Sequence, residues 1–390
     1  MSNSTTQNKT LLTPFNIVAG AIVVIGLILT FVRFTKGIGA VTNLDNNYPW
    51  GIWIGFDLMC GVALAAGGYV TSSAVYLFGM RKFHAAVRPA ILTGFLGYLF
   101  VIIALLYDLG RPYRLPYPFA VSPGPTSMLF EVGLCVALYF HVLLLEFFPA
   151  VLEWLGLAKF RNMIHKLTIG LTIFGVVLST LHQSSLGALF LIAPSKLHPL
   201  WYSQYMAVYF FVSSIAAGLS MVIFEGFLSH RYMHDKMDDV HLEETKEIPY
   251  AFGKAASLVL MAYFAIKIIG LISDSNWHYL STPYGYWFLV EMLGFVALPC
   301  MLYAVGSRER NYTLIKIASV ITILGIVLNR LNVSVICFNW KLPLAQKYIP
   351  SLSEVGISLF MVTCIILTYR FIANRMPVLY EHPDYKDSDH

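Results

Sequence analysis

The chain has 390 residues, of which 57% are hydrophobic and only 12% are Asp, Glu, Lys or Arg. Soluble proteins carry roughly 25% charged residues, so this composition excludes an ordinary soluble protein and predicts an integral membrane protein. The formal net charge of +5 is spread over the segments between apolar runs. The sequence has no dense Lys/Arg cluster of the kind that binds nucleic acid, which excludes that class of partner.

Ten apolar segments are long enough to cross a bilayer, which takes about 20 helical residues. The first has no small-residue cleavage site after it, so we expect a retained helix rather than a signal peptide. The sequence therefore predicts an all-α polytopic membrane protein. In chain order the predicted spans are Phe15–Phe34, Gly51–Phe78, Pro89–Leu109, Met128–Phe148, Leu167–Leu186, Gln204–Leu228, Ala255–Ile272, Tyr284–Gly306, Leu314–Leu331 and Leu352–Phe371.

The distribution of basic residues predicts an orientation. An even number of spans places both termini on one side of the membrane, which we call the inner side. Of the 26 Lys and Arg residues, 17 fall on that side, 8 fall on the opposite side and Lys267 lies within a span. Because cytoplasmic connections carry an excess of Lys and Arg, both termini are expected in the cytoplasm.

The outer connections differ in chemistry from the inner ones. They are rich in Pro, Gly and aromatic residues, as in GRPYRLPYPFAVSPGPTS and SDSNWHYLSTPYGYW. Such loops suit the docking of a partner protein, although an aromatic belt at headgroup level would explain the Trp and Tyr residues equally well. The segment Gln183–Ser203 is itself partly apolar, and we expect it to form a short interfacial or re-entrant helix.

Most apolar spans carry one ionisable residue, although a charge within a bilayer costs several kcal/mol unless it is paired or hydrated. At about 1.5 Å per helical residue, these groups are all expected towards the outer side, with the carboxylate in the second span about 10 Å below the surface. Glu131 of the fourth span and His182 of the fifth are expected to approach each other. Lys267 of the seventh span and Glu291 of the eighth are expected to form a buried, structural ion pair. The seven residues are Asp57, Asp108, Glu131, His182, Lys267, Glu291 and Arg330.

A carboxylate, a histidine and an arginine around an apolar cavity suit a quinone head group. Quinone reduction takes up protons, and a carboxylate or a His side chain can relay them near neutral pH. We therefore expect Asp57, Glu131 and His182 to act on the quinone, with Asp108 and Arg330 lining the pocket. Each group could instead be a buried residue whose polar atoms bind a backbone carbonyl.

The sequence predicts no resident metal cofactor. The five cysteines are dispersed, without a C-x-x-C motif or a C-x-x-C-H haem attachment. Membrane haem b needs two His at one depth, whereas His141 and His182 are expected at different depths. In the inner half, His141, Glu146 and Glu225 could be stations of a proton path or residues that reach the headgroups.

Four segments carry a family resemblance: PWGIWIGFDLMCG, LFEVGLC, STLHQSSLGALFLIAPSKLHPLW and FEGFLSHR. From about Lys36 to Phe371 the chain resembles the membrane subunit of the hydrogenase-2 type, within the NrfD/polysulfide-reductase membrane-subunit family. The resemblance implies two four-helix bundles with a peripheral helix at each end. The corresponding segments are 1–50 (first peripheral helix), 51–186 (first bundle), 187–331 (outer loop and second bundle) and 332–390 (last peripheral helix and tail).

The resemblance also implies a function. Family members carry no haem or iron–sulfur cluster of their own, and exchange electrons between menaquinone and a ferredoxin-like iron–sulfur subunit on the periplasmic face of the bacterial inner membrane. Further partners would be a hydrogenase, a multihaem cytochrome c or a molybdopterin-type subunit. The family's quinone site falls on Asp57, Glu131 and His182, and the adjacent Gln183 and Ser185 could add hydrogen bonds.

Two other functions compete with this one. A secondary transporter would place its charged residues at the midplane, beside a pair of helices broken by Gly or Pro, and the sequence predicts neither feature. A purely structural membrane anchor would not need the charged residues at all. The sequence leaves open the electron donor, the direction of electron flow and whether protons are pumped.

Overall fold

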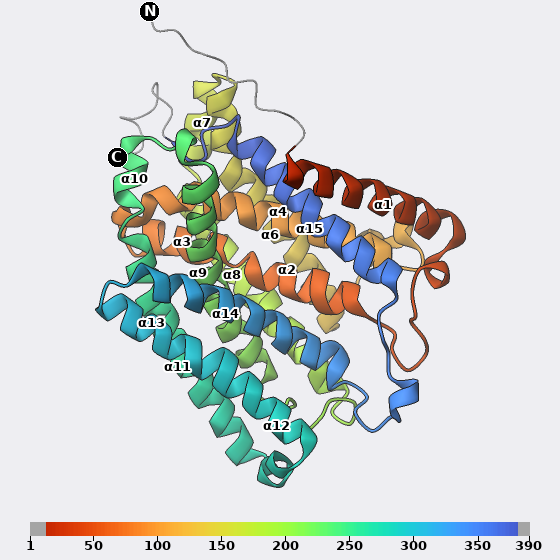
Figure 1. Ribbon diagram of the computed structural model, residues 1–390. Helices are drawn as coiled ribbons and strands as arrows, with labels where there is room; N and C mark the ends of the chain where they lie inside the picture. Colours follow the sequence, from red (N-terminus) through yellow and green to blue (C-terminus); the bar gives the residue numbers. More distant parts are fainter. Residues whose placement is uncertain (1–12, 381–390) are drawn as a thin grey trace, which may run out of the picture.

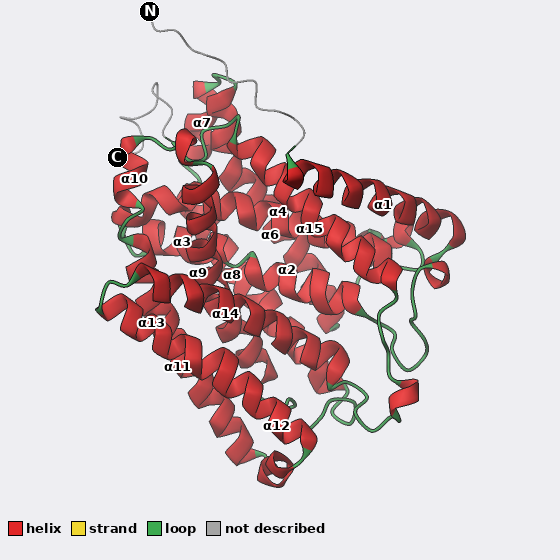
Figure 2. Cartoon of the chain, viewed as in Figure 1, coloured by secondary structure: helices red, strands yellow, loops and turns green. Residues whose placement is uncertain are grey.

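The computed structural model describes residues 13–380, and all statements below concern that part of the chain. It is a bundle of membrane-length helices with no named strand among the described residues (Figures 1 and 2). Ten helices are long and apolar enough to cross a membrane, which confirms the predicted fold class and number of spans. The start of α1 and the end of α15 lie at one end of the bundle, the inner end as defined above (Figure 1).

Several spans consist of consecutive helical pieces. The ten spans are Pro14–Lys36, Trp53–Leu77, Arg81–Asp108, Met128–Trp154, Thr168–Ile192, Met206–Tyr232, His241–Ser273, Pro283–Arg308, Tyr312–Ile336 and Leu352–Ala373. They contain α1 (Pro14–Lys36), α2 (Met59–Leu64), α3 (Gly67–Ser72), α4 (Val87–Asp108), α6 (Met128–Trp154), α8 (Thr168–Ala188), α9 (Met206–Tyr232), α11 (Ile248–Ser273), α12 (Pro283–Leu289), α13 (Leu298–Arg308), α14 (Tyr312–Leu331) and α15 (Leu352–Ala373). The short helices α5 (Tyr117–Ala120), α7 (Ala158–His165) and α10 (Asp239–Glu244) belong to the connections or span ends.

The spans pack in two groups and a pair. Helices α3, α4, α6 and α8 pack on one another, as do α9, α11, α13 and α14, while α1 packs along α15 and α15 contacts α4. The two groups meet along α9, which packs against α8 and is crossed by α2 and α3. A Cβ atom on Gly218 would come within 2.7 Å of the backbone of Ala66 and Gly67, so the close crossing requires glycine there.

Three spans are irregular where the sequence predicted continuous helices. The second span opens and closes with π-helical turns, Trp53–Leu58 and Ser73–Leu77, and breaks at Ala65–Ala66. The eighth contains a π-helical stretch, Val290–Ala297, and the ninth ends in another, Asn332–Ile336. The π-helical turns frequently occur at functional sites because they re-aim side chains. Here they contain or adjoin three of the predicted charged residues, namely Asp57, Glu291 and Arg330.

The outer loops are tied together. Leu197 and Phe338 form an isolated antiparallel bridge, and the Asn339 side chain donates a hydrogen bond to the Asn47 carbonyl. The His198 ring packs in an edge-on arrangement against Trp340, with 4.7 Å between ring centroids. The expected helix after the fifth span exists as a 3-10 turn, Leu189–Ile192, which continues that span rather than lying apart from it.

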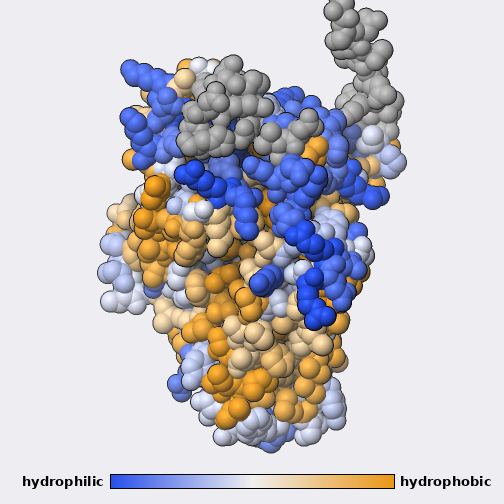
Figure 3. All heavy atoms as spheres, turned by 90° about the vertical axis from the view of Figure 1, so that its left-hand side faces the viewer, coloured by the Kyte–Doolittle hydropathy of each residue, from blue (hydrophilic) through white to orange (hydrophobic). Residues whose placement is uncertain are grey.

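The surface has the polarity of a membrane protein. Hydrophilic side chains gather at the inner end, and a broad apolar zone covers the middle of the molecule (Figure 3). Apolar side chains that point outward from the spans, such as Phe31 at 71% exposed and Met301 at 66%, would face lipid. The chain is a multi-pass membrane protein.

Candidate functional site

A histidine–tyrosine pair lies at the centre of the first helix group. His182 of α8 is 0% exposed, and its Nδ1 atom lies 2.8 Å from the Leu178 carbonyl oxygen. A carbonyl can only accept, so Nδ1 carries a proton; Nε2 is hydrogen-bonded to the Tyr98 hydroxyl, which is the donor when the ring is neutral. The His182 ring also stacks on Tyr139 of α6, with centroids 5.9 Å apart. Both ring nitrogens are therefore hydrogen-bonded.

This pair lies deeper than the sequence predicted. The fifth span runs on to Ile192, so His182 is ten residues, about 15 Å, from its outer end rather than near the surface. Glu131 is in the first turn of α6, eight residues or about 12 Å from the Tyr139 that packs on His182. The expected approach of Glu131 to His182 is therefore not found.

Unpaired polar atoms surround the pair. The Tyr139 hydroxyl, the Ser179 hydroxyl and the Gln183 side-chain oxygen are buried without a hydrogen bond of good geometry, although Ser179 and Gln183 both lie close to the Tyr98 hydroxyl. The Gln183 amide nitrogen does have a partner, the Val62 carbonyl oxygen 2.9 Å away in the second span. Native interiors leave few polar groups unsatisfied, so several close together indicate a site prepared for a polar ligand or water. We call Tyr98, Tyr139, Ser179, His182 and Gln183 the His182 cluster.

Sequence reasoning found only part of this cluster. His182 and Gln183 were predicted, whereas Tyr98, Tyr139 and Ser179 were missed because an uncharged residue in an apolar span looks like core packing. The available signal was a phenol hydroxyl at mid-depth in two neighbouring spans, since a buried tyrosine usually needs a partner for its hydroxyl.

The predicted carboxylates of the second and third spans lie apart from the cluster. Asp57 accepts a hydrogen bond of 2.7 Å from Ser358 of α15, so it is tied to the last span. Asp108 ends α4, where the buried Arg33 guanidinium donates to the carbonyls of Tyr107 and Leu109, each at 2.7 Å. Asp57 thus ties α15 to the second span, whereas Arg33 ties α1 to the end of α4 through backbone carbonyls and leaves one Asp108 carboxylate oxygen without a partner.

The remaining predicted charges lie in the second helix group. Glu291 accepts hydrogen bonds from Trp201 at 2.7 Å, Asn329 at 2.7 Å and Asn332 at 2.5 Å. The expected ion pair with Lys267 is therefore wrong in its detail: the Lys267 ammonium lies 4.3 Å from the centre of the Tyr209 ring instead. The three donors to Glu291 make this a well-satisfied structural carboxylate.

Arg330 is fully buried beside this network. It donates to the Asn329 side chain at 2.8 Å and to the Ser213 hydroxyl at 2.9 Å, and its guanidinium packs 3.8 Å from the Phe210 ring centre. Its Nε atom has no acceptor. Arg330 therefore belongs to the second helix group, with no hydrogen bond to the His182 cluster.

The other candidates are scattered. Ser185 is buried on α8, while Glu131 is half-buried at the start of α6. His141 is exposed on α6 and Glu146 accepts a 3.0 Å hydrogen bond from Thr172 of α8. Glu225 is buried in α9, with one carboxylate oxygen unpaired. The seven ionisable residues thus form several separate environments instead of one outer pocket.

Two large cavities lie at the inner end, away from all these groups except Glu146 and Glu225. One, of about 720 Å³, reaches Glu225 and is bordered by His230, His241 and Arg310. The other, of about 670 Å³, reaches Glu146 and is bordered by Arg81, Lys82, Arg88, Arg161 and Lys166. Neither is lined by Asp57, Glu131 or His182.

The histidines of the described residues do not fit a membrane haem b. Such a haem needs two axial His at one depth, facing each other across the bundle. Within the middle of the spans only His141 and His182 are available, and His141 points outward from α6 while both nitrogens of His182 are engaged. Among the described residues, no group of three or more His, Cys, Asp or Glu side chains is placed to hold a metal ion.

The fold and the buried polar residues define a ten-span helical membrane protein with intramembrane hydrogen-bonding chemistry. Comparison with known proteins gives its family: the model "Polysulphide reductase, NrfD" matches residues 40–337, so the chain belongs to the NrfD family. The predicted family resemblance is confirmed.

Three relatives match over most of their length. A Nitratidesulfovibrio vulgaris sequence named only "Protein" is 67% identical and covers 98% of each chain. The "Probable Ni/Fe-hydrogenase 2 b-type cytochrome subunit" of Escherichia coli is 31% identical over 95% of this chain and 93% of its own. The "Menaquinone reductase, integral membrane subunit" of Nitratidesulfovibrio vulgaris is 27% identical over 89% and 88%. The relatives with informative names are thus subunits of redox complexes.

Proposed function

We propose that this chain is the quinone-reactive membrane subunit of a respiratory oxidoreductase, exchanging electrons between an iron–sulfur partner on the outer face and menaquinone. The observation that carries the proposal is the His182 cluster, in which buried hydroxyl and amide groups with spare hydrogen-bonding capacity surround a buried histidine. A relative named as a menaquinone reductase subunit supports the identity of the quinone. The chain is proposed to lie in the bacterial inner membrane, with both termini in the cytoplasm.

The cluster suits a head group that is reduced by two electrons and two protons. Each quinone carbonyl oxygen becomes a hydroxyl, so each needs a hydrogen-bond donor that can also supply a proton. The Tyr139 and Ser179 hydroxyls are free to donate. If His182 first takes up a proton at Nε2, that proton can pass to the Tyr98 oxygen as Tyr98 gives its own to a ligand, and the imidazole returns to its neutral form. His182 would act on the quinone through Tyr98 rather than by direct contact.

The outer loops support a partner on that face. Between the third and fourth spans, Tyr113 is 68% exposed and Val121 is 65% exposed, and before the tenth span Leu344 is 82% exposed. These apolar side chains lie outside the spans, where lipid tails would not cover them. Exposed apolar groups in one region mark protein interfaces. A ferredoxin-like subunit docked there would bring its cluster to the outer side; a hydrogenase, multihaem cytochrome c or molybdopterin-type subunit would complete the assembly.

Purification of the tagged chain from its native membrane in mild detergent tests the proposal. The expected result is co-purification of an iron–sulfur subunit and menaquinone. A His182→Ala variant should assemble with the same partners and keep their activity with artificial dyes, while quinone-linked activity is nearly lost. Quinone-linked activity at the parent rate in this variant would favour the structural-anchor function. A lone polypeptide that binds a solute would favour a transporter.

A further inference from the structure

The basic cavity at the inner end has no part in the proposed quinone chemistry. Its volume is about 670 Å³, and its border brings together side chains from the third, fourth and fifth spans and from α7. Five Arg and Lys residues line it, whereas its carboxylates are Glu146 and Glu244. The basic residues are Arg81, Lys82, Arg88, Arg161 and Lys166.

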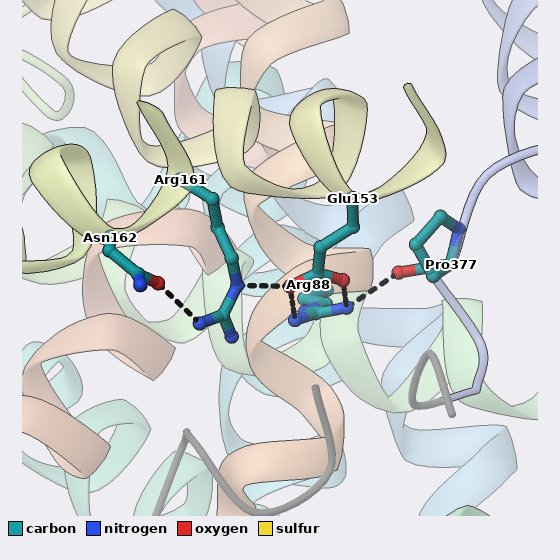
Figure 4. A network of polar contacts seen from close by, with 5 residues as sticks. All are labelled: Arg88, Glu153, Arg161, Asn162 and Pro377. Carbon is teal, nitrogen blue, oxygen red and sulfur yellow. Dashed lines mark hydrogen bonds and ion pairs between the residues drawn. The ribbon is translucent and has the colours of Figure 1, made fainter. Parts of the chain in front are cut away.

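A charge network adjoins this basic cavity: Arg88 and Arg161, which line it, both bind Glu153 (Figure 4). The Glu153 carboxylate of α6 accepts two hydrogen bonds of 2.8 Å from Arg88 of α4 and one of 2.8 Å from Arg161 of α7. Arg88 also donates to the Pro377 carbonyl at 3.0 Å, so the network ties three helices to the segment after α15. Both guanidinium groups bind this carboxylate, which holds Arg88 and Arg161 in place beside the cavity.

The deeper wall is mostly apolar, apart from Glu146, which is hydrogen-bonded to Thr172, and it borders the zone that lipid would cover. Ile91, Phe147, Ile169 and Leu171 line the cavity, and all four lie within the membrane spans. Ile169 is 59% exposed, so the apolar lining continues onto the outside of the bundle. The basic side chains sit above it at the span ends, at the depth of the lipid headgroups.

We propose that this basic cavity binds an anionic phospholipid of the inner leaflet. The phosphodiester would lie among the Arg and Lys side chains, and an acyl chain would run over the apolar wall. Clusters of basic residues on the cytoplasmic side of membrane spans attract anionic headgroups, and pockets of this kind between helices hold them. Free phosphate has the same headgroup chemistry but would leave the apolar wall uncovered, which favours the lipid as the occupant.

Native mass spectrometry of the full chain in detergent tests the proposal. The chain is titrated with phosphatidylglycerol or with phosphatidylcholine of the same acyl chains. Phosphatidylglycerol should be retained with at least about tenfold preference, because each Lys or Arg near an anionic surface contributes about fivefold in affinity. An excess of inorganic phosphate should leave the retained lipid in place.

The site variant is Arg81→Gln/Lys82→Gln/Lys166→Gln, which spares the buried network so that the fold is kept. Its matched control is Lys159→Gln/Lys254→Gln/Arg308→Gln, which removes the same charge from exposed residues at the same end that do not line the cavity. The preference should fall by about tenfold or more in the site variant and stay unchanged in the control.

Three outcomes would overturn the proposal. The first is equal retention of the two lipids, which would follow if acidic residues of the chain itself filled the cavity. Loss of the preference in both triple variants would mean a diffuse surface effect without a site. Displacement of the lipid by inorganic phosphate would mean an anion site with no role for the acyl chain.

Discussion

The substitution Tyr98→Phe tests the role of the Tyr98 hydroxyl in the His182 cluster, because it removes the phenol oxygen and keeps the ring. The ring keeps its edge-on packing on Tyr139, at 4.8 Å between centroids, so the helices should stay in place. The lost hydroxyl is the donor to His182 Nε2, which is left buried without a partner. An unsatisfied buried acceptor costs about 1–3 kcal/mol, which sets the expected loss of unfolding free energy. Removing a proton relay should also lower the quinone-linked rate by on the order of 100-fold.

The matched control is Tyr303→Phe. Tyr303 is equally buried, and its hydroxyl donates to Ser220 at 2.8 Å, but it lies in the second helix group away from His182. Both variants are assayed in the assembled complex for menaquinone reduction and for partner activity with an artificial dye. Only Tyr98→Phe should lose quinone-linked activity, and neither should change the dye rate. An equal loss in both variants, or none in Tyr98→Phe, would refute the relay.

Three further predictions concern stability and orientation. Glu153→Gln should cost about 3–5 kcal/mol of unfolding free energy, because it removes the carboxylate that binds the buried Arg161 and the partly exposed Arg88, whereas the exposed Glu243→Gln should change it by less than about 1 kcal/mol; thermal unfolding in detergent measures both. Burial and the Lys347 ammonium lower the pKa of His198 to about 4, and protonation would break the hydrogen bond that its Nδ1 accepts from the Leu200 N–H. Neutral His198 therefore contributes its full share to the free energy of unfolding above the ordinary pKa of about 6.5, and this share is lost as the pH falls towards about 4. The melting temperature should drop over this pH window, and it should drop less in His198→Gln. A C-terminal alkaline phosphatase fusion should be inactive and a fluorescent-protein fusion should fluoresce, as the excess of inner-side basic residues predicts.

Each of the three has a contradicting result. Equal melting of the two Glu variants would mean that the buried network adds no stability. A pH profile unchanged in His198→Gln would assign the acid sensitivity to another group. An active phosphatase fusion would invert the orientation and place the proposed partner face in the cytoplasm.

Hydrophobicity alone was enough to predict the fold, because length and apolar character decide which segments cross a membrane. It could not place the ends of the spans: Leu189–Ile192 is apolar enough to extend the fifth span, and this moved His182 from the outer end to mid-depth. Nor could it predict the π-helical turns around Asp57 and Glu291, which depend on how neighbouring helices pack.

Charge was a poor guide to which residues meet. Glu291 was matched with Lys267 by depth, but hydrogen-bond donors from Trp201, Asn329 and Asn332 reach it instead. The depth of a residue along its own helix is readable from sequence, whereas the direction in which it points depends on packing. Uncharged partners leave almost no trace in a composition-based analysis, so Tyr98 was overlooked beside His182.

Photolabelling tests the central claim most directly. The assembled complex is irradiated with an azido-menaquinone analogue, and the labelled residues are identified by peptide mass spectrometry. The account predicts labels on α4, α6 and α8 around Tyr98, Tyr139 and Ser179, and their loss when unmodified menaquinone is added in excess. Displaceable labels confined to the second helix group or to the inner-end cavities would contradict a quinone site at the His182 cluster.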